Sequence, residues 1–176
     1  MRPVLLSLAS LALLAACQGM QSGAPADAPR ASANLQPTKN GKATGTVNFV
    51  QVGDKVRVSG NISGLVPGRE HGFHIHEAGD CSSGDGMSAK GHFNPLGRPH
   101  GHPDTPERHA GDMPALKADL YGNAALETDL DIITVTPGPT SIVGRGLIVH
   151  ADPDDYRTQP TGNAGARLAC AVIQRR

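Results

Sequence analysis

The sequence predicts an all-β fold, an antiparallel sandwich or barrel that carries one long loop. Three observations predict it. Apolar and polar residues alternate in short runs from about residue 42 onward, which is the period of half-buried strands. Gly (22 residues) and Pro (14 residues) are plentiful, which favours many turns over long helices. Hydrophobic residues make up 38% but aromatic ones only 3%, so the core must be built from Val, Ile, Leu and Ala.

Residues 1–16 are predicted to be a signal peptide. Arg2 gives a positive start, and the apolar run from Val4 to Leu14, about eleven residues, is too short to span a bilayer, which needs roughly 20. The ending Leu14-Ala15-Ala16-Cys17 resembles the bacterial lipobox, which predicts a lipid on Cys17. An ordinary secretory signal with a chance cysteine is the alternative. Gln18 after the cysteine favours the outer membrane, so we expect an envelope protein facing the periplasm.

Residues 17–40 are rich in Ala, Pro, Ser and Gly, which predicts a lipidated N-terminus followed by a flexible tether. Residues 41–176 then form one domain. Basic and acidic residues balance at 16 each without a Lys/Arg run, so nucleic acid is not expected as a partner. Membrane contact is expected through the lipid anchor alone. The sequence leaves the oligomeric state open, with a homodimer among the alternatives.

The predicted strands follow one another along the domain. Residues 46–62 alternate on both sides of a turn at Gly53-Asp54, which indicates a hairpin. The alternation returns over 116–130 and ends with the apolar runs 146–150 and 168–173. Between Glu77 and Pro114 no period is sustained. A loop of about forty residues is costly to order, so metal or disulfide cross-links are expected to hold it.

The three cysteines suggest one such cross-link. If Cys17 carries a lipid, Cys81 and Cys170 remain as a pair in an oxidising compartment. A bridge between them would close a loop of about 90 residues and stabilise the fold by roughly 4 to 5 kcal/mol. Two unpaired buried thiols are the alternative.

Histidine is the one compositional oddity, because all eight lie between His71 and His150. His74 and His76 are separated by one residue, so on a strand both rings project from the same face. Imidazole suits copper and zinc, and a carboxylate in a nitrogen site is common for zinc. Two four-coordinate sites require one shared ligand if they draw on these side chains: His74, His76, His92, His100, His109, Asp112 and His150.

The same stretches carry a family resemblance. In chain order, HGFHIHE, GHFNP, RPHG, ERHAGD, LIVHADPDDY and TGNAGARLAC resemble the signature segments of copper/zinc superoxide dismutases. The resemblance spans about residues 43–174 and implies an eight-stranded Greek-key β-barrel. It implies one copper and one zinc per subunit, with His92 bridging them. The implied copper ligands are His74, His76, His92 and His150, and the implied zinc ligands are His92, His100, His109 and Asp112.

Further roles are implied by the resemblance. Cys81 and Cys170 match the family disulfide, and Asp154 matches a carboxylate that links a copper histidine to a zinc histidine. Arg167 matches the arginine beside the copper channel. A simple turn position for Asp154 and a surface charge for Arg167 are the alternatives. His71 and His102 match no ligand and are interpreted as hydrogen-bonded or solvent-exposed.

The resemblance implies disproportionation of superoxide to O2 and hydrogen peroxide by Cu(II)/Cu(I) cycling, with His92 carrying a proton. One segment departs from the family: 155–161 is shorter than in the animal and plant enzymes and lacks their steering charges, for which Arg157 is a candidate substitute. A non-catalytic copper-binding protein and a plain structural sandwich are the rival readings. The complete set of copper-matching histidines, together with Arg167, favours catalysis.

Overall fold

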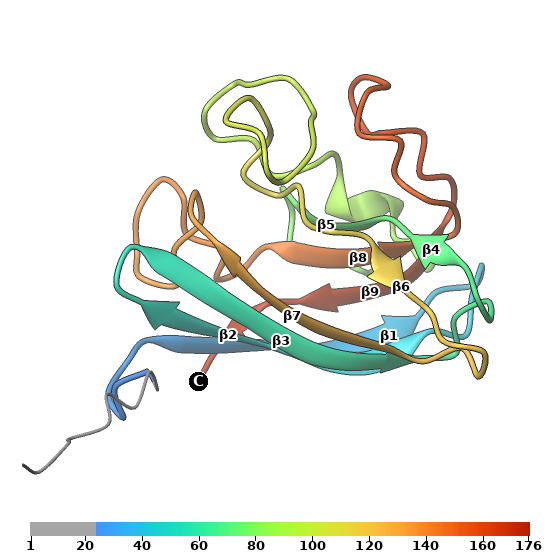
Figure 1. The fold of residues 1–176 in the computed structure, drawn as a ribbon, viewed down its shortest axis with the longest axis horizontal. Helices are drawn as coiled ribbons and strands as arrows, with labels where there is room; N and C mark the ends of the chain where they lie inside the picture. Colours follow the sequence, from blue (N-terminus) through green and yellow to red (C-terminus); the bar gives the residue numbers. More distant parts are fainter. Residues whose placement is uncertain (1–23) are drawn as a thin grey trace, which may run out of the picture.

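The computed structural model describes residues 24–176 and confirms the all-β antiparallel prediction (Figure 1). The described part contains ten strands and one short 3-10 helix. Their bounds are β1 Arg30–Pro37, β2 Thr44–Val52, β3 Lys55–Ser63, β4 Glu70–His71, β5 Phe73–His76, η1 Met87–Ala89, β6 Leu116–Lys117, β7 Ala124–Leu130, β8 Gly146–His150, β9 Arg167–Val172 and β10 Gln174–Arg175. Within residues 24–176, the one helical element is far too short to be a candidate membrane span.

Eight strands form one curled antiparallel sheet (Figure 1). Seven follow the order β5-β8-β9-β1-β2-β3-β7, and β10 pairs with β1; β4 and β6 form a separate small ribbon. The hairpin prediction is confirmed, since β2 and β3 pair over nine residues and place Phe49 opposite Val58. Aliphatic residues dominate the core, as the composition requires, and Phe49, Phe73 and Phe93 are its fully buried aromatic side chains.

Strand β1 corrects the predicted tether. The sequence predicts that residues 30–37 belong to the flexible segment, yet they pair with β2, β9 and β10. Ala31, Ala33 and Leu35 are at most 2% exposed, so this strand buries a row of small side chains. The segment has the Ala-, Ser- and Pro-rich composition of a linker, and it becomes part of the sheet only because it pairs with strands that are distant in the sequence. The ordered domain therefore begins at or before residue 30.

The predicted alternation over 116–130 is only partly strand. Residues 116–117 form β6, 124–130 form β7, and Leu120 lies in the turn between them with 83% exposure. The long loop between β5 and β6 is confirmed, with η1 as its single helical turn. This loop and the segment that joins β8 to β9 both cover the same side of the sheet, above β5 and β8 (Figure 1). The candidate site lies between them and the sheet.

Candidate metal centre

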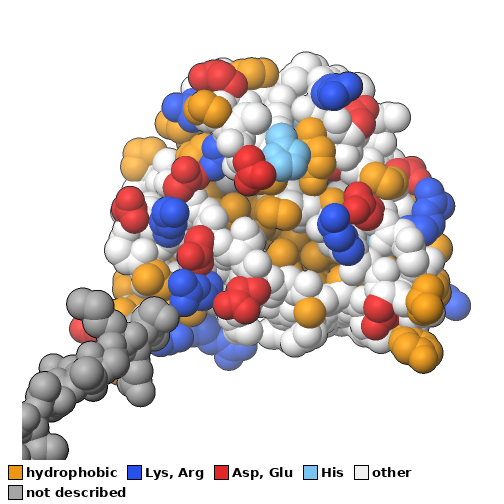
Figure 2. All heavy atoms as spheres, in the orientation of Figure 1, with side chains coloured by type: hydrophobic (Ala, Val, Ile, Leu, Met, Phe, Trp, Pro, Cys, Tyr) orange, Lys and Arg blue, Asp and Glu red, His pale blue; other side chains and the backbone are white. Residues whose placement is uncertain are grey.

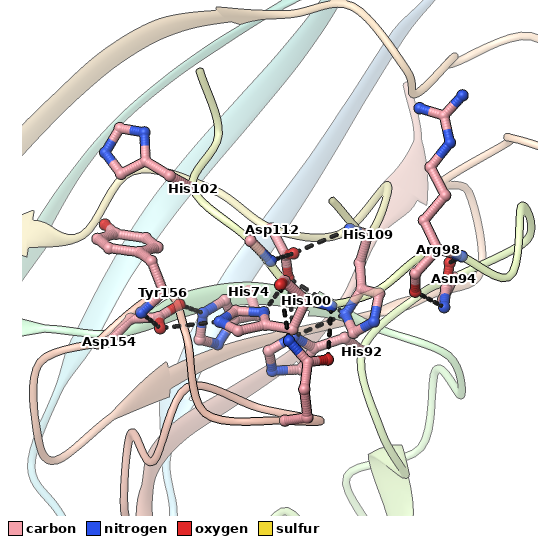
Figure 3. Close-up of polar contacts among 12 residues, drawn as sticks. His74, His92, Asn94, Arg98, His100, His102, His109, Asp112, Asp154 and Tyr156 are labelled. Atoms are coloured by element: carbon pink, nitrogen blue, oxygen red, sulfur yellow. Dashed lines mark hydrogen bonds and ion pairs between the residues drawn. The ribbon is translucent and has the colours of Figure 1, made fainter. Parts of the chain in front are cut away.

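Two groups of buried side chains could each hold a metal ion, and they share His92; Figure 3 shows the second group together with His74. Within each group the potential ligand atoms all lie within 4.8 Å of one another. One group contains His74, His76, His92 and His150, and the other contains His92, His100, His109 and Asp112. These are the two ligand sets that the family resemblance implies, and the fold brings each of them together.

The sheet positions three of these histidines. His74 and His76 alternate on β5 with the buried core residues Phe73 and Ile75, and His150 ends the neighbouring strand β8. The register of β8 against β9 shifts between Val149 and His150, which marks a bulge beside the site. The Nε2 atoms of His76 and His150 lie 3.3 Å apart. Regular strand pairing therefore gathers these rings without help from the loop.

The loop is attached to the other edge of β5 by backbone contacts. Single antiparallel bridges join His76 to His92 and His74 to Asp112. Phe93 N–H donates to the Ile75 carbonyl at 2.8 Å, and Ile75 N–H donates to the Gly111 carbonyl at 2.9 Å. A Cβ on Gly111 would lie 2.2 Å from the Ile75 oxygen, so the close approach requires glycine there. These contacts bring the loop ligands against the strand ligands.

Hydrogen bonds to the protein orient the rings. Asp154 accepts from His74 Nε2 at 2.7 Å and from His100 Nε2 at 2.9 Å, so one carboxylate links the two groups (Figure 3). His76 Nδ1 donates to the Lys90 carbonyl at 2.8 Å. His150 Nδ1 donates to the Gly165 carbonyl at 3.3 Å. In His74, His76 and His150 the bond fixes a tautomer and leaves the opposite ring nitrogen free to bind a metal, whereas the opposite nitrogen of His100 faces Asp112 at 3.0 Å.

His92 presents one nitrogen to each group. Its Nδ1 lies 2.9 Å from Asp112 Oδ1 and 3.4 Å from His109 Nδ1, inside the second group. Its Nε2 and the Nδ1 of His74 are buried and have no hydrogen-bond partner among the described residues. A buried polar atom without a partner is costly unless a ligand satisfies it. The donor set and these two atoms fit a pair of adjacent metal ions.

Without metal, the two groups differ in electrostatics. Burial lowers the pKa of His92 to about 4, and burial together with neighbouring histidines holds the pKa values of His76 and His150 well below the ordinary value. Burial opposes the charge of His100, but hydrogen bonds to Asp112 and Asp154 raise its pKa to about 9. His76, His92 and His150 of the first group are therefore neutral imidazoles, which are ready to bind a cation, while the second group is built around the carboxylate of Asp112.

Arg167 is held at the edge of the first group. Its guanidinium donates to the Gly86 carbonyl at 2.5 Å and to the Lys90 carbonyl at 2.6 Å, and the latter oxygen also accepts from His76. Burial lowers the pKa of Arg167, which is only 8% exposed. Its position beside a candidate metal ligand excludes the simple surface-charge alternative. Lys90 was missed by sequence reasoning because its contribution is a backbone oxygen, which no motif marks.

The remaining predicted residues are placed as follows. Cys81 and Cys170 form a disulfide with a Cα–Cα distance of 5.8 Å, which joins the long loop to β9. Cys17 lies outside the described residues. His71 is fully buried and its Nδ1 donates to the His150 carbonyl at 2.8 Å, whereas His102 is partly exposed. Both readings as non-ligand histidines agree with these positions.

Comparison with known proteins identifies the family. The family model for copper/zinc superoxide dismutase matches residues 43–173. The chain belongs to the copper/zinc superoxide dismutase family. It is 47% identical over 139 residues to a Cu-Zn superoxide dismutase of Paramecium bursaria Chlorella virus 1, which covers 76% of this chain and 73% of the relative. It is 40% identical over 151 residues to Superoxide dismutase [Cu-Zn] 2 of Aquifex aeolicus, covering 82% of this chain and 86% of the relative.

The all-β fold of this chain also occurs in a solved structure. A crystal structure of the clock protein EA4 superposes with a TM-score of 0.76 at 38% sequence identity, covering 86% of this chain and 98% of that one. Membership makes this protein an oxidoreductase of the copper/zinc superoxide dismutase type, with copper and zinc as cofactors and superoxide as substrate. Its surface mixes charges of both signs over the face in view, in keeping with equal counts of acidic and basic residues (Figure 2).

Proposed function

We propose that copper is held by His74, His76, His92 and His150, that zinc is held by His92, His100, His109 and Asp112, and that His92 bridges them. The observation that carries this proposal is the orientation of His92, whose two nitrogens face different groups. When bound, copper supplies one-electron exchange with superoxide and zinc supplies a fixed positive charge. The all-imidazole group suits a copper that cycles, and the carboxylate-containing group suits zinc.

His92 is also proposed to carry a proton. With Nδ1 directed into the zinc group, Nε2 is the ring atom that could take up a proton when it is not bound to copper, and return that proton beside the substrate when it binds copper again. Hydrogen peroxide requires protons that superoxide does not bring. A buried nitrogen without a protein partner can deliver one without first breaking a competing hydrogen bond.

Arg167 is proposed to orient the substrate anion. Two backbone carbonyls fix its guanidinium, so it does not have to be ordered when the anion arrives. An anion about 4 Å away gains on the order of 4 kcal/mol at an effective dielectric near 20. The guanidinium would therefore strengthen binding of the superoxide anion beside His76 and His150, two of the proposed copper ligands.

The cellular setting is proposed from the N-terminal sequence. A signal peptide over 1–16 and a lipid on Cys17 would anchor the enzyme in the cell envelope, facing the periplasm and protecting the envelope from superoxide. Because β1 begins at Arg30, the tether in this proposal is shortened to residues 18–29. Labelling of cells with radioactive palmitate should mark the wild-type protein and not Cys17→Ala. Equal labelling of both would contradict the anchor.

The central experiment is metal content measured beside superoxide consumption on the purified protein. We expect about one copper and one zinc per chain together with catalytic turnover. His150→Ala should lose copper and activity while it retains zinc, because His150 contacts only the first group. A protein that binds copper and leaves superoxide untouched would instead be a copper-binding protein. Loss of both metals in His150→Ala would contradict the proposed division of ligands.

A further inference from the structure

The segment between β8 and β9 reaches across to the loop that carries His100, and two of its side chains have no role in the site described so far. We propose that Gln159, assisted by Tyr156, is a positioning residue that holds the backbone of His100 and so keeps the zinc-binding loop in place. The inference rests on the proposed function, because it takes His100 to be a zinc ligand.

Gln159 forms a reciprocal pair of hydrogen bonds with one residue. The His100 N–H donates to Gln159 Oε1 at 2.8 Å, and Gln159 Nε2 donates to the His100 carbonyl at 2.9 Å. Both backbone polar groups of a candidate ligand are thus satisfied by a single side chain that lies 59 residues away. Nε2 also donates to the Arg157 carbonyl at 3.3 Å, which ties the amide to its own segment.

Tyr156 joins its segment to the loop at two points beyond His100, and its ring lies beside His102 in Figure 3. Its phenolic oxygen accepts the Ala115 N–H at 3.0 Å, and its ring packs against His102 with centroids 4.6 Å apart. Its backbone is left-handed, with φ of 57°, a conformation that aromatic residues rarely adopt. The surrounding contacts must therefore hold it there.

The loop needs such support because its own backbone provides little. No strand lies between η1 and β6 in the described chain, so the polar groups of His100 have no regular sheet partner. Asp154 holds the ring of His100 and Gln159 holds its backbone, which together define both position and rotation. The packing is tight, since a Cβ on Gly162 would lie 1.8 Å from Asp154 and 2.6 Å from His100 Nε2. Pre-ordering of this kind lowers the cost of binding an ion.

The test compares zinc release from variants of the full protein. Gln159→Leu replaces the amide with an apolar side chain of similar size and removes both hydrogen bonds, so transfer of zinc to a chromogenic chelator should be faster by about tenfold. Gln159→Glu keeps an acceptor for the His100 N–H but places a carboxylate against the His100 carbonyl. Its rate of zinc release should lie between those of the wild type and Gln159→Leu. Gln174→Leu, on an exposed glutamine of β10, is the matched control and should equal the wild type. The visible spectrum of bound copper should stay unchanged in all three.

A second measurement does not depend on metal. In chelator-treated protein, amide exchange at His100 should accelerate in Gln159→Leu, while exchange at Ile75 on β5 stays slow. Zinc release within twofold of the wild type, or equal protection of the His100 amide, would overturn the role of Gln159. Faster exchange at both amides would also overturn it, because it would indicate general loss of the fold. A wild-type protein that binds no zinc would instead refute the proposed function, before any variant is compared.

Discussion

Removal of the disulfide between Cys81 and Cys170 should cost the protein a large part of its stability. The two cysteines are 89 residues apart, so the bridge restricts about half of the chain in the unfolded state. The chain-entropy relation for a loop of this length gives about 4 to 5 kcal/mol. Whole domains are stable by about 5–15 kcal/mol, so the loss is comparable with the total. The Cys81→Ala/Cys170→Ala protein is expected to be marginal without metals.

Urea denaturation of chelator-treated protein measures this effect. The variant should lose 4 to 5 kcal/mol of unfolding free energy and show a steeper dependence on urea, because its unfolded chain is more expanded. Cys81→Ala alone should lose about as much unfolding free energy, because either substitution removes the disulfide and the remaining thiol contributes little. Wild-type protein reduced under the same conditions is the control for side-chain packing. A loss below about 1 kcal/mol would refute the entropic reasoning.

Three further predictions concern Arg167, the backbone of Lys90 and the pair His92 and His100. Arg167→Glu should retain copper but lower kcat/KM at least a hundredfold, because an attraction of about 4 kcal/mol becomes a repulsion; an unchanged rate constant in pulse radiolysis would remove Arg167 from catalysis. Lys90 has φ 63° and ψ −149°, a backbone region used almost only by glycine. Lys90→Gly should therefore raise the free energy of unfolding by about 1 kcal/mol. Lys90→Ala should leave it unchanged, and urea titrations measure both variants. In metal-free protein, burial lowers the pKa of His92 to about 4, so stability should fall as pH drops below its ordinary value of 6.5. The stability contributed by charged His100 should be lost as pH rises through its pKa of about 9. The free energy of unfolding should therefore be greatest near pH 6.5, and a pH series of denaturation curves without that maximum would contradict both pKa shifts.

The residues that could be predicted from sequence are those whose role follows from local periodicity or from a motif. His74 and His76 share a face because strand side chains alternate, and β5 places them so. The β2–β3 hairpin follows from alternation and a Gly-Asp turn in the same way. These features need no knowledge of distant contacts.

Other features depend on partners far away in the chain and leave no local signal. The residues of β1 have the composition of a linker, and only the neighbouring strands reveal that Ala31 and Ala33 are buried. Lys90 acts through its carbonyl, which every residue type possesses. Gln159 acts through an amide in the segment 155–161, whose sequence stands out only for its lack of the family's steering charges. Tertiary hydrogen bonds of this kind cannot be derived from spacing.

The two halves of the centre are thus ordered by different physical means. Strand pairing between β5 and β8 places three histidines of the copper group, whereas the zinc group depends on side-chain hydrogen bonds between two irregular segments. His92 belongs to both groups, and its backbone bridges to β5. A perturbation of the loop should therefore reach copper through His92, through the Lys90 carbonyl that orients His76 and through the Asp154 link to His74, while the strand backbones keep their places. Zinc retention is then the more sensitive indicator of order in the loop, and copper geometry is the more sensitive indicator of strand pairing in the sheet.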